Sequence, residues 1–166
     1  MKSLNLKILV ANALVASVYV ALSMLFMPVA FNAVQFRISE LLNLLPFFNP
    51  SLGVGLIVGC FITNLSSPFG FYDIVFGTLS TAFTVFCISR TKSLFIATLW
   101  PTVFSITIGI MISFLSNSPL IVTTLSVMAG QFIISTIIGF PFYKALLRNR
   151  WFINLVKLYG IREVEK

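Results

Sequence analysis

The sequence predicts an all-α membrane protein, a six-helix transmembrane bundle with both termini cytoplasmic. Of its 166 residues, 58% are hydrophobic and only 9% are charged, a composition far from that of a water-soluble domain. Four apolar runs have about the length that crosses a hydrocarbon core of ~30 Å. Basic residues gather at three places beside those runs. These features together favour membrane-spanning helices over a soluble fold.

The four long apolar runs are the predicted spanning helices. The first is longer than the apolar region of a signal peptide, which has about 7 to 15 residues, so we expect it to be retained. The last is longer than a perpendicular helix requires, and Gly139 and Pro141 predict a kink or an exit from the bilayer there. The four runs are Ile8 to Met27, Phe71 to Ile88, Leu94 to Leu115 and Leu120 to Tyr143.

The basic residues predict the topology, because Lys and Arg collect on the cytoplasmic flanks of membrane helices. The clusters contain ten of the eleven basic residues, so membrane topology accounts for the net charge of +7 without nucleic acid. If all three are cytoplasmic, residues 28–70 cross the membrane twice or not at all. The clusters are Lys2 and Lys7, then Arg90 and Lys92, and in the tail Lys144, Arg148, Arg150, Lys157, Arg162 and Lys166.

Two shorter segments, Val34 to Leu45 and Pro50 to Leu65, supply the remaining helices. Pro46, Asn49 and Pro50 separate them as stop and start signals. Twelve helical residues rise only about 18 Å, so the first segment spans only if residues 46–49 continue it. A re-entrant hairpin inside the bundle is the alternative. The last two long helices turn at residues 116–119, which completes a count of six.

Residues 1–147 form the predicted substrate-binding membrane domain, and residues 148–166 form a basic amphipathic cytoplasmic tail. In the tail, apolar residues from Trp151 to Tyr159 interleave with Arg148, Arg150 and Lys157. This pattern is typical of an interfacial helix or of an ordinary basic anchor.

Three charged residues inside the apolar sequence are the candidates for function. Arg37, the eleventh basic residue, shares a helix face with Glu40 and Asn43 through spacings of three. Charges at bilayer depth usually face a partner or a cavity. Arg37 and Glu40 either neutralise each other or bind a substrate. Asp73 lies near the start of its helix, where it either caps the helix or binds a substrate.

Small residues recur at two places. Ser51, Gly55, Gly59 and Thr63 recur every four positions, which predicts a close helix crossing. The first helix carries Ala13, Ser17 and Ala21 with the same spacing. That second set is explained either by packing within the bundle or by docking of another membrane subunit.

The sequence lacks the residues that several classes of function require. The chain has no His, and its two cysteines, Cys60 and Cys87, lie in apolar surroundings. No spacing of Cys and His predicts a metal site, and no Gly-rich phosphate loop predicts ATP hydrolysis. We therefore expect no enzyme, no cofactor and no metal.

Several short motifs lie between residues 34 and 78. The motifs are Val34–Gln35–Phe36–Arg37–Ile38–Ser39–Glu40 with Asn43 and Pro46, Gly59–Cys60–Phe61–Ile62–Thr63–Asn64, Ser67–Pro68–Phe69–Gly70, and Asp73–Ile74–Val75–Phe76–Gly77–Thr78. Together they resemble the QueT family, and the similarity extends over nearly the whole chain.

This resemblance implies a substrate-binding S component of an energy-coupling factor transporter in the bacterial cell membrane. Its substrate would be a queuosine precursor, the aminomethyl-deazaguanine base. Its partners would be a transmembrane coupling protein and two cytoplasmic ABC ATPases. S components often show an Ala-x-x-x-Ala docking element on the first helix. This sequence departs from that element and has Ala13, Ser17 and Ala21 with the same spacing. The departure weakens the inference that the first helix docks the coupling protein.

The resemblance also suggests ligand contacts. A guanine-like edge has adjacent N–H donors that suit a carboxylate, and an aminomethyl cation suits a second carboxylate. The expected contacts are Glu40 on the ring edge, Asp73 on the cation, Asn64 and Arg37 for orientation, Asn43 and Gln131 as further polar contacts, and Phe69 or Tyr72 for stacking.

Two other classes stay open. In a stand-alone secondary carrier or channel, Arg37, Glu40 and Asp73 would line an ion or proton path. In a structural or assembly subunit, the same charges would only pair with each other.

Overall fold

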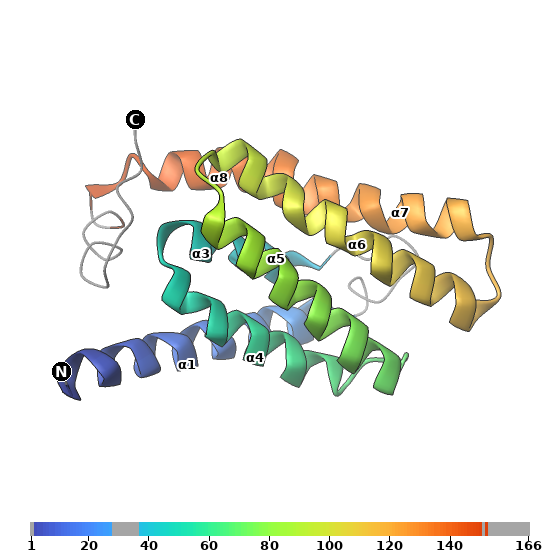
Figure 1. Cartoon of the computed structure of the whole chain (residues 1–166), viewed down its shortest axis with the longest axis horizontal. Coiled ribbons are helices and arrows are strands. Elements are labelled where there is room, and N and C mark those ends of the chain that lie inside the picture. Colours follow the sequence, from blue (N-terminus) through green and yellow to red (C-terminus); the bar gives the residue numbers. More distant parts are fainter. Residues whose placement is uncertain (1, 28–36, 151, 153–166) are drawn as a thin grey trace.

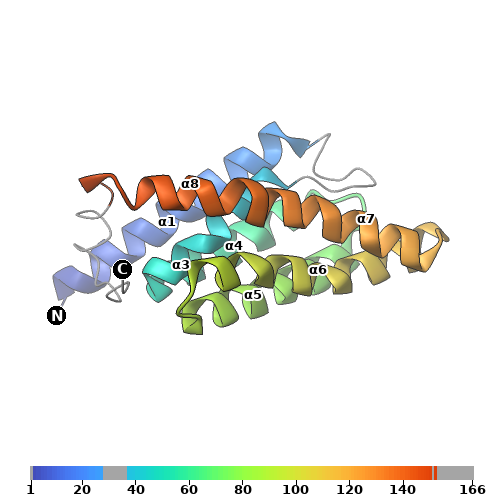
Figure 2. The ribbon, with the colours of Figure 1, turned by 90° about the horizontal axis from the view of Figure 1, so that it is seen from above.

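In the computed structural model, the chain is described over residues 2–27, 37–150 and 152, and this part contains helices and no strand. Figures 1 and 2 show the helices running side by side along one long axis. In chain order, the elements are α1 (Lys2–Leu25), the 3-10 helix η1 (Ile38–Leu44), α3 (Leu45–Phe48), the 3-10 helix η2 (Pro50–Leu52), α4 (Gly53–Asn64), the π-helix η3 (Asp73–Gly77), α5 (Thr78–Arg90), α6 (Leu94–Ser116), α7 (Leu120–Phe132), the π-helix η4 (Ile133–Ile138) and α8 (Gly139–Leu146).

Four continuous helical stretches are long and apolar enough to cross a membrane, which confirms the four predicted spanning runs. They are Leu6–Leu25, Asp73–Arg90, Leu94–Ser116 and Leu120–Leu146. Two shorter apolar stretches, Ile38–Phe48 and Pro50–Asn64, complete six helical segments in the described part of the chain. The cytoplasmic placement of the termini stays a prediction.

The helix stop expected at Pro46 is not observed in the segment before Asn49. The helix does not stop there, because Pro46 occupies the first turn of α3, where the missing N–H has no helical partner to lose. The break comes at Asn49, whose side chain accepts a hydrogen bond from the Ser51 N–H. Ile38–Phe48 is short for a full crossing. Residues 34–36 of the predicted helix lie outside the described residues.

The small-residue ladder of α4 packs against α1, as predicted. A Cβ added to Gly59 would lie 2.9 Å from Cβ of Tyr19, and one added to Gly55 would overlap the Asn12 carbonyl. The Asn12 side chain accepts from the Gly55 N–H and donates to the Ser51 carbonyl at 2.9 Å. Glycine therefore allows the two backbones to approach closely.

The predicted turn at residues 116–119 joins α6 and α7. Asn117 ends α6 in the left-handed region with a φ of 49°, a conformation that Asn tolerates well. The helical irregularity expected at Gly139 and Pro141 lies just before them, in η4. Helical structure then continues through α8, and the expected exit from the bilayer at Gly139 and Pro141 stays a prediction.

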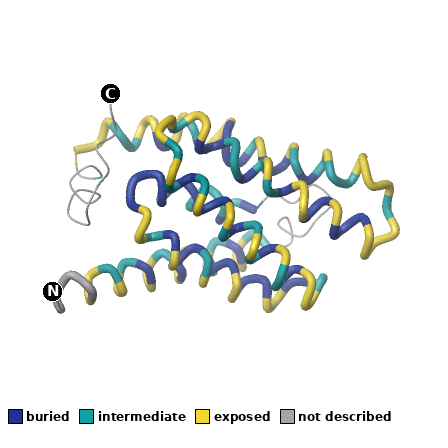
Figure 3. Tube along the Cα trace, viewed as in Figure 1, coloured by how far each residue is buried: buried dark blue, intermediate teal, exposed yellow. Residues whose placement is uncertain are grey.

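Three apolar clusters surround a polar interior, and buried positions follow the inward faces of the helices (Figure 3). One cluster joins η1 and α3 to α5, α6 and α8, with Phe48 and Tyr143 stacked at 5.5 Å. A second lies around Tyr19 and Leu56. The third joins α6 and α7 around Ile108 and Val127. The polar side chains described next lie among these clusters.

Candidate functional site

The three predicted charged residues form one connected cluster. A terminal nitrogen of Arg37 (Nη2) lies 2.9 Å from Oδ2 of Asp73, which is fully buried. The other terminal nitrogen (Nη1) lies 3.9 Å from Oε1 of Glu40. Arg37 is the N-cap of η1 and Glu40 lies three residues later within it, but Asp73 comes from η3, 36 residues after Arg37. The tertiary structure therefore places one guanidinium between two carboxylates.

Amide side chains hold the second oxygen of Glu40. Gln131 donates from Nε2 to Oε2 of Glu40 at 2.8 Å, although the two residues are 91 positions apart. Asn43 donates to the same oxygen at 3.2 Å. Gln131 lies near the end of α7, two residues before η4 begins. π-helices are often found at functional sites. The predicted residues Glu40, Asn43 and Gln131 are thus brought together.

Asn64, on α4, supports the cluster through the backbone of Asp73. The hydrogen bonds that the structure shows for Asn64 do not involve the carboxylate oxygens of Asp73. Its Nδ2 donates to the backbone carbonyl of Asp73 at 3.0 Å and to the sulfur of Cys60 at 3.4 Å. A Cβ at Gly77 would lie 2.6 Å from this Nδ2 and 3.0 Å from Oδ1 of Asp73. Gly77 therefore leaves the space in which Asn64 and Asp73 lie against η3.

A narrow cavity lies beside this cluster. Its lining comes from four parts of the bundle, namely η1, the end of η3 with α5, α6, and α7. The lining residues are Arg37, Glu40, Gly77, Ser80, Thr81, Thr84, Pro101, Ser105, Ile108, Val127 and Gln131. Seven of these eleven residues carry polar or charged side chains, so the cavity offers many hydrogen-bonding groups.

The hydroxyl-bearing wall of this cavity was not identified from the sequence. Ser80, Thr81 and Thr84 come from α5, and Ser105 comes from α6. The sequence did contain a pattern that indicates this wall, because Gly77, Thr81 and Thr84 have the spacing of one helix face. Small hydroxyl residues are common in membrane helices, however, and the spacing does not say what that face contacts.

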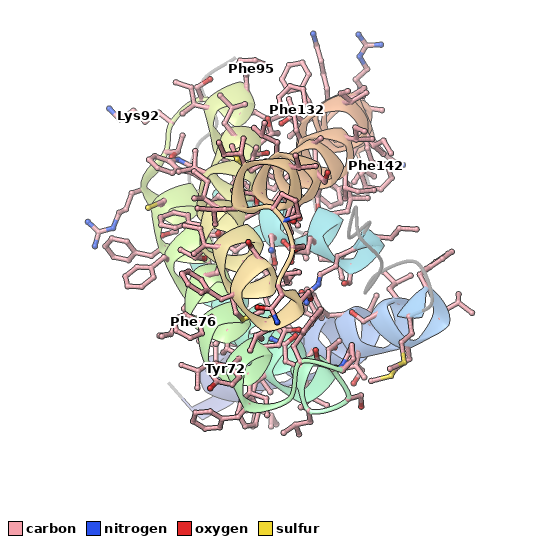
Figure 4. The ribbon with its side chains drawn as sticks, turned by 90° about the vertical axis from the view of Figure 1, so that its right-hand side faces the viewer. Tyr72, Phe76, Lys92, Phe95, Phe132 and Phe142 are labelled. Atoms are coloured by element: carbon pink, nitrogen blue, oxygen red, sulfur yellow. The ribbon has the colours of Figure 1, made fainter. Side chains whose placement is uncertain are left out.

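Some predicted contacts lie away from the cavity lining. Asp73, Asn43 and Asn64 are fully buried behind it. Asp73, expected on the ligand cation, contacts Arg37, because η3 turns its side chain into the bundle, and its contact with a ligand stays a prediction. Phe69 packs against the cluster of Ile108 and Val127. Tyr72 is 51% exposed and lies on the outside of the bundle, as Figure 4 shows, so it does not face the cavity.

The small residues on α1 face outward. Ala13, Ser17 and Ala21 are exposed, whereas the opposite face of α1 buries Asn12, Ala16, Tyr19 and Ser23 in the bundle. Packing within the bundle, one of the two explanations offered for these residues, is therefore wrong. The outward face is free to contact lipid or another membrane protein.

The described residues offer no group of three His, Cys, Asp or Glu side chains that could hold a metal ion. Cys60 and Cys87 are both free thiols. What the cluster provides is a buried set of donors and acceptors, with carboxylate, guanidinium, amide and hydroxyl groups around one cavity. This chemistry is suited to recognising a small polar molecule.

Four apolar helices of spanning length, with charged residues buried among them, are the features of a multi-pass membrane protein. Comparison with known families agrees, since the model of the QueT transporter family matches residues 9–148. The chain therefore belongs to the QueT transporter family, and it is a transporter and not an enzyme.

One relative is the queuosine precursor transporter QueT of Lactococcus lactis subsp. cremoris (strain MG1363). It is 28% identical over 141 residues, which cover 75% of this chain and 83% of the relative. No solved structure matches the chain.

Proposed function

We propose that this chain is the substrate-binding S component of an energy-coupling factor transporter that imports an aminomethyl-deazaguanine base. The observation that carries the proposal is Glu40, a carboxylate at the cavity wall held by Gln131 and Asn43. A carboxylate accepts the two adjacent N–H groups of a guanine-like edge. The name of the Lactococcus relative, a queuosine precursor transporter, supports this class of substrate.

The charge of the cluster favours a cationic form of the base. One guanidinium, Arg37, lies between two carboxylates, Glu40 and Asp73. With both carboxylates ionised, the cluster carries a formal charge of −1. A cation is stabilised by such a site, and its charge-assisted hydrogen bonds are stronger than neutral ones. An aminomethyl group supplies that cation, whereas a nitrile at the same ring position does not.

The described contacts suggest a division of roles. Glu40 and Gln131 would bind the base directly, and Arg37 would orient it from the same wall of the cavity. Asp73 would act through Arg37, which it holds at 2.9 Å. Asn64 would support the backbone of η3, and Asn43 would hold Glu40 in place.

Phe69 is the better placed of the two predicted stacking residues. It packs against the apolar cluster that contains Ile108 and Val127, and both of these residues line the cavity. Tyr72 lies on the exterior.

Calorimetry on the purified chain tests the substrate. We expect saturable binding of the aminomethyl base. The neutral nitrile analogue should bind about 10-fold or more weakly, because it lacks the cation that the net negative charge of the cluster stabilises. Absence of saturable binding would exclude the proposed substrate. Equal affinity for the two compounds would exclude recognition of the cation.

The partners would be a transmembrane coupling protein and two ABC ATPases, and the exposed face of Ala13, Ser17 and Ala21 is the proposed docking surface. Ala13→Leu should reduce co-purification of the ATPases without changing base affinity, because a bulky side chain prevents close helix contact. Val103→Leu, at an exposed position on α6, is the matched control. Uptake by the chain alone in liposomes without ATP would instead indicate a secondary carrier or channel.

A further inference from the structure

Four hydroxyl side chains line the cavity, and two of them are already engaged with backbone carbonyls. Ser80 donates to the Phe104 carbonyl at 2.9 Å. Ser105 donates to the Thr102 carbonyl at 2.7 Å. In an apolar environment a hydroxyl normally finds such a partner, because an unpaired buried polar group costs free energy. Neither of these donors is free for another molecule.

Thr81 is engaged too. Its Oγ1 lies 3.2 Å from the sulfur of Cys60. Thr84, one turn further along α5, is different, since its hydroxyl makes no hydrogen bond within the described part of the chain. It is only 2% exposed, and it lines the cavity together with Arg37 and Glu40.

The position of Thr84 distinguishes it from the other unpaired threonines. The hydroxyls of Thr78, Thr102 and Thr124 are also buried without a hydrogen-bond partner in the described part of the chain, but these three residues do not line the cavity. Thr and Ser in membrane helices commonly donate to a carbonyl three or four residues earlier. Here Thr98 donates to the Phe95 carbonyl at 2.7 Å, and Ser135 donates to the Gln131 carbonyl at 2.7 Å. Thr84 therefore keeps a donor and an acceptor available at the cavity wall.

We propose that Thr84 is a ligand contact, forming a hydrogen bond to the base from the α5 side of the cavity. This inference rests on the proposed function and extends it. Glu40 and Gln131 belong to η1 and α7, so Thr84 would hold a different polar group of the base from the one that Glu40 binds. Contacts from separate helices would fix the orientation of a flat ring.

Calorimetry with the aminomethyl base tests this assignment in Thr84→Val, which removes the hydroxyl and keeps the shape. We expect the Kd to rise about 2- to 12-fold, as for the loss of one neutral hydrogen bond. Thr84→Ser keeps the hydroxyl and should remain within about 2-fold of the unmodified chain. Thermal unfolding of each variant should show that the fold is kept. If Thr84→Val does not fold, Thr84→Ala serves as the second variant.

Thr78→Val is the matched control. Thr78 is on the same helix, and its hydroxyl also lacks a partner among the described residues, but it does not line the cavity. Its substitution should leave the Kd unchanged. If the unmodified chain binds the base and Thr84→Val binds it equally well, the role of Thr84 is excluded while the proposed function stands. If the unmodified chain does not bind, the proposed function itself fails.

Discussion

The contact between α1 and α4 and the charged cluster beside the cavity are both polar, but they satisfy their polar groups differently. In the first, the amide of Asn12 donates to the carbonyls of Ile8 and Ser51 and accepts from the Gly55 N–H. These bonds use both hydrogens and the oxygen of the side chain. The α1–α4 contact is therefore complete within the protein itself.

In the charged cluster, by contrast, some buried acceptor oxygens lack a hydrogen-bond partner in the described part of the chain. Oδ1 of Asn43, of Asn64 and of Asp73 is buried without a hydrogen-bond partner in the described part of the chain. Buried polar atoms are nearly always paired in proteins, so these three unpaired oxygens distinguish the charged cluster from the α1–α4 contact. The comparison predicts that substitutions at the α1–α4 contact change stability alone, whereas substitutions in the cluster also change binding.

The largest effect is expected from Arg37→Gln. This change leaves Asp73 buried without its partner cation, at a cost of about 3–5 kcal/mol in the free energy of unfolding. Chemical unfolding in detergent measures it. The double variant Arg37→Gln with Asp73→Asn removes both charges and should recover part of the loss. A double variant as unstable as the single one would show that the ion pair is not the cause.

Glu40→Gln should mainly affect binding. The neutral amide keeps the size of the side chain and can still accept from Gln131, so we expect little change in unfolding temperature. Loss of a charged hydrogen-bond acceptor should raise the Kd for the aminomethyl base about 10- to 100-fold. Calorimetry checks both ligand affinity and stoichiometry. An unchanged Kd would remove Glu40 from the binding site.

Gly55→Ala tests the α1–α4 contact. The added methyl group would overlap the Asn12 carbonyl, so the helices must separate, at a cost of about 1–3 kcal/mol. The Kd of the folded fraction should not change. Val54→Ala, at a neighbouring position that is 62% exposed, is the control and should have little effect. A weaker affinity in Gly55→Ala would show that the two regions are coupled.

Ser23→Ala should have the smallest effect. Ser23 donates to Oγ of Ser39 at 2.7 Å and connects α1 to η1. Loss of this neutral hydrogen bond should cost about 0.5–1.5 kcal/mol of stability. Ser17→Ala is the control, because the exposed Ser17 hydroxyl bonds only to its own helix. Equal stabilities of the two variants would show that the contact between α1 and η1 contributes nothing.

The sequence by itself determined the class of the protein and its main helices. Apolar runs of about 20 residues have no stable place in water, so four spanning helices followed from composition and length. The spacing of Gly55 and Gly59 also predicted a close crossing, because only small side chains let two backbones approach. Arg37, Glu40 and Asp73 were recognisable as candidates because charge is rare at bilayer depth.

The tertiary structure decided which groups meet. Spacing on one helix shows that Arg37 and Glu40 share a face, but it cannot show that Gln131 reaches Glu40 across 91 residues. Spacing also could not show that Asp73 contacts Arg37 rather than lining the cavity, or that Thr84 lines the cavity. These contacts depend on how the helices rotate and cross, and that geometry is set by packing over the whole bundle, not by any local pattern.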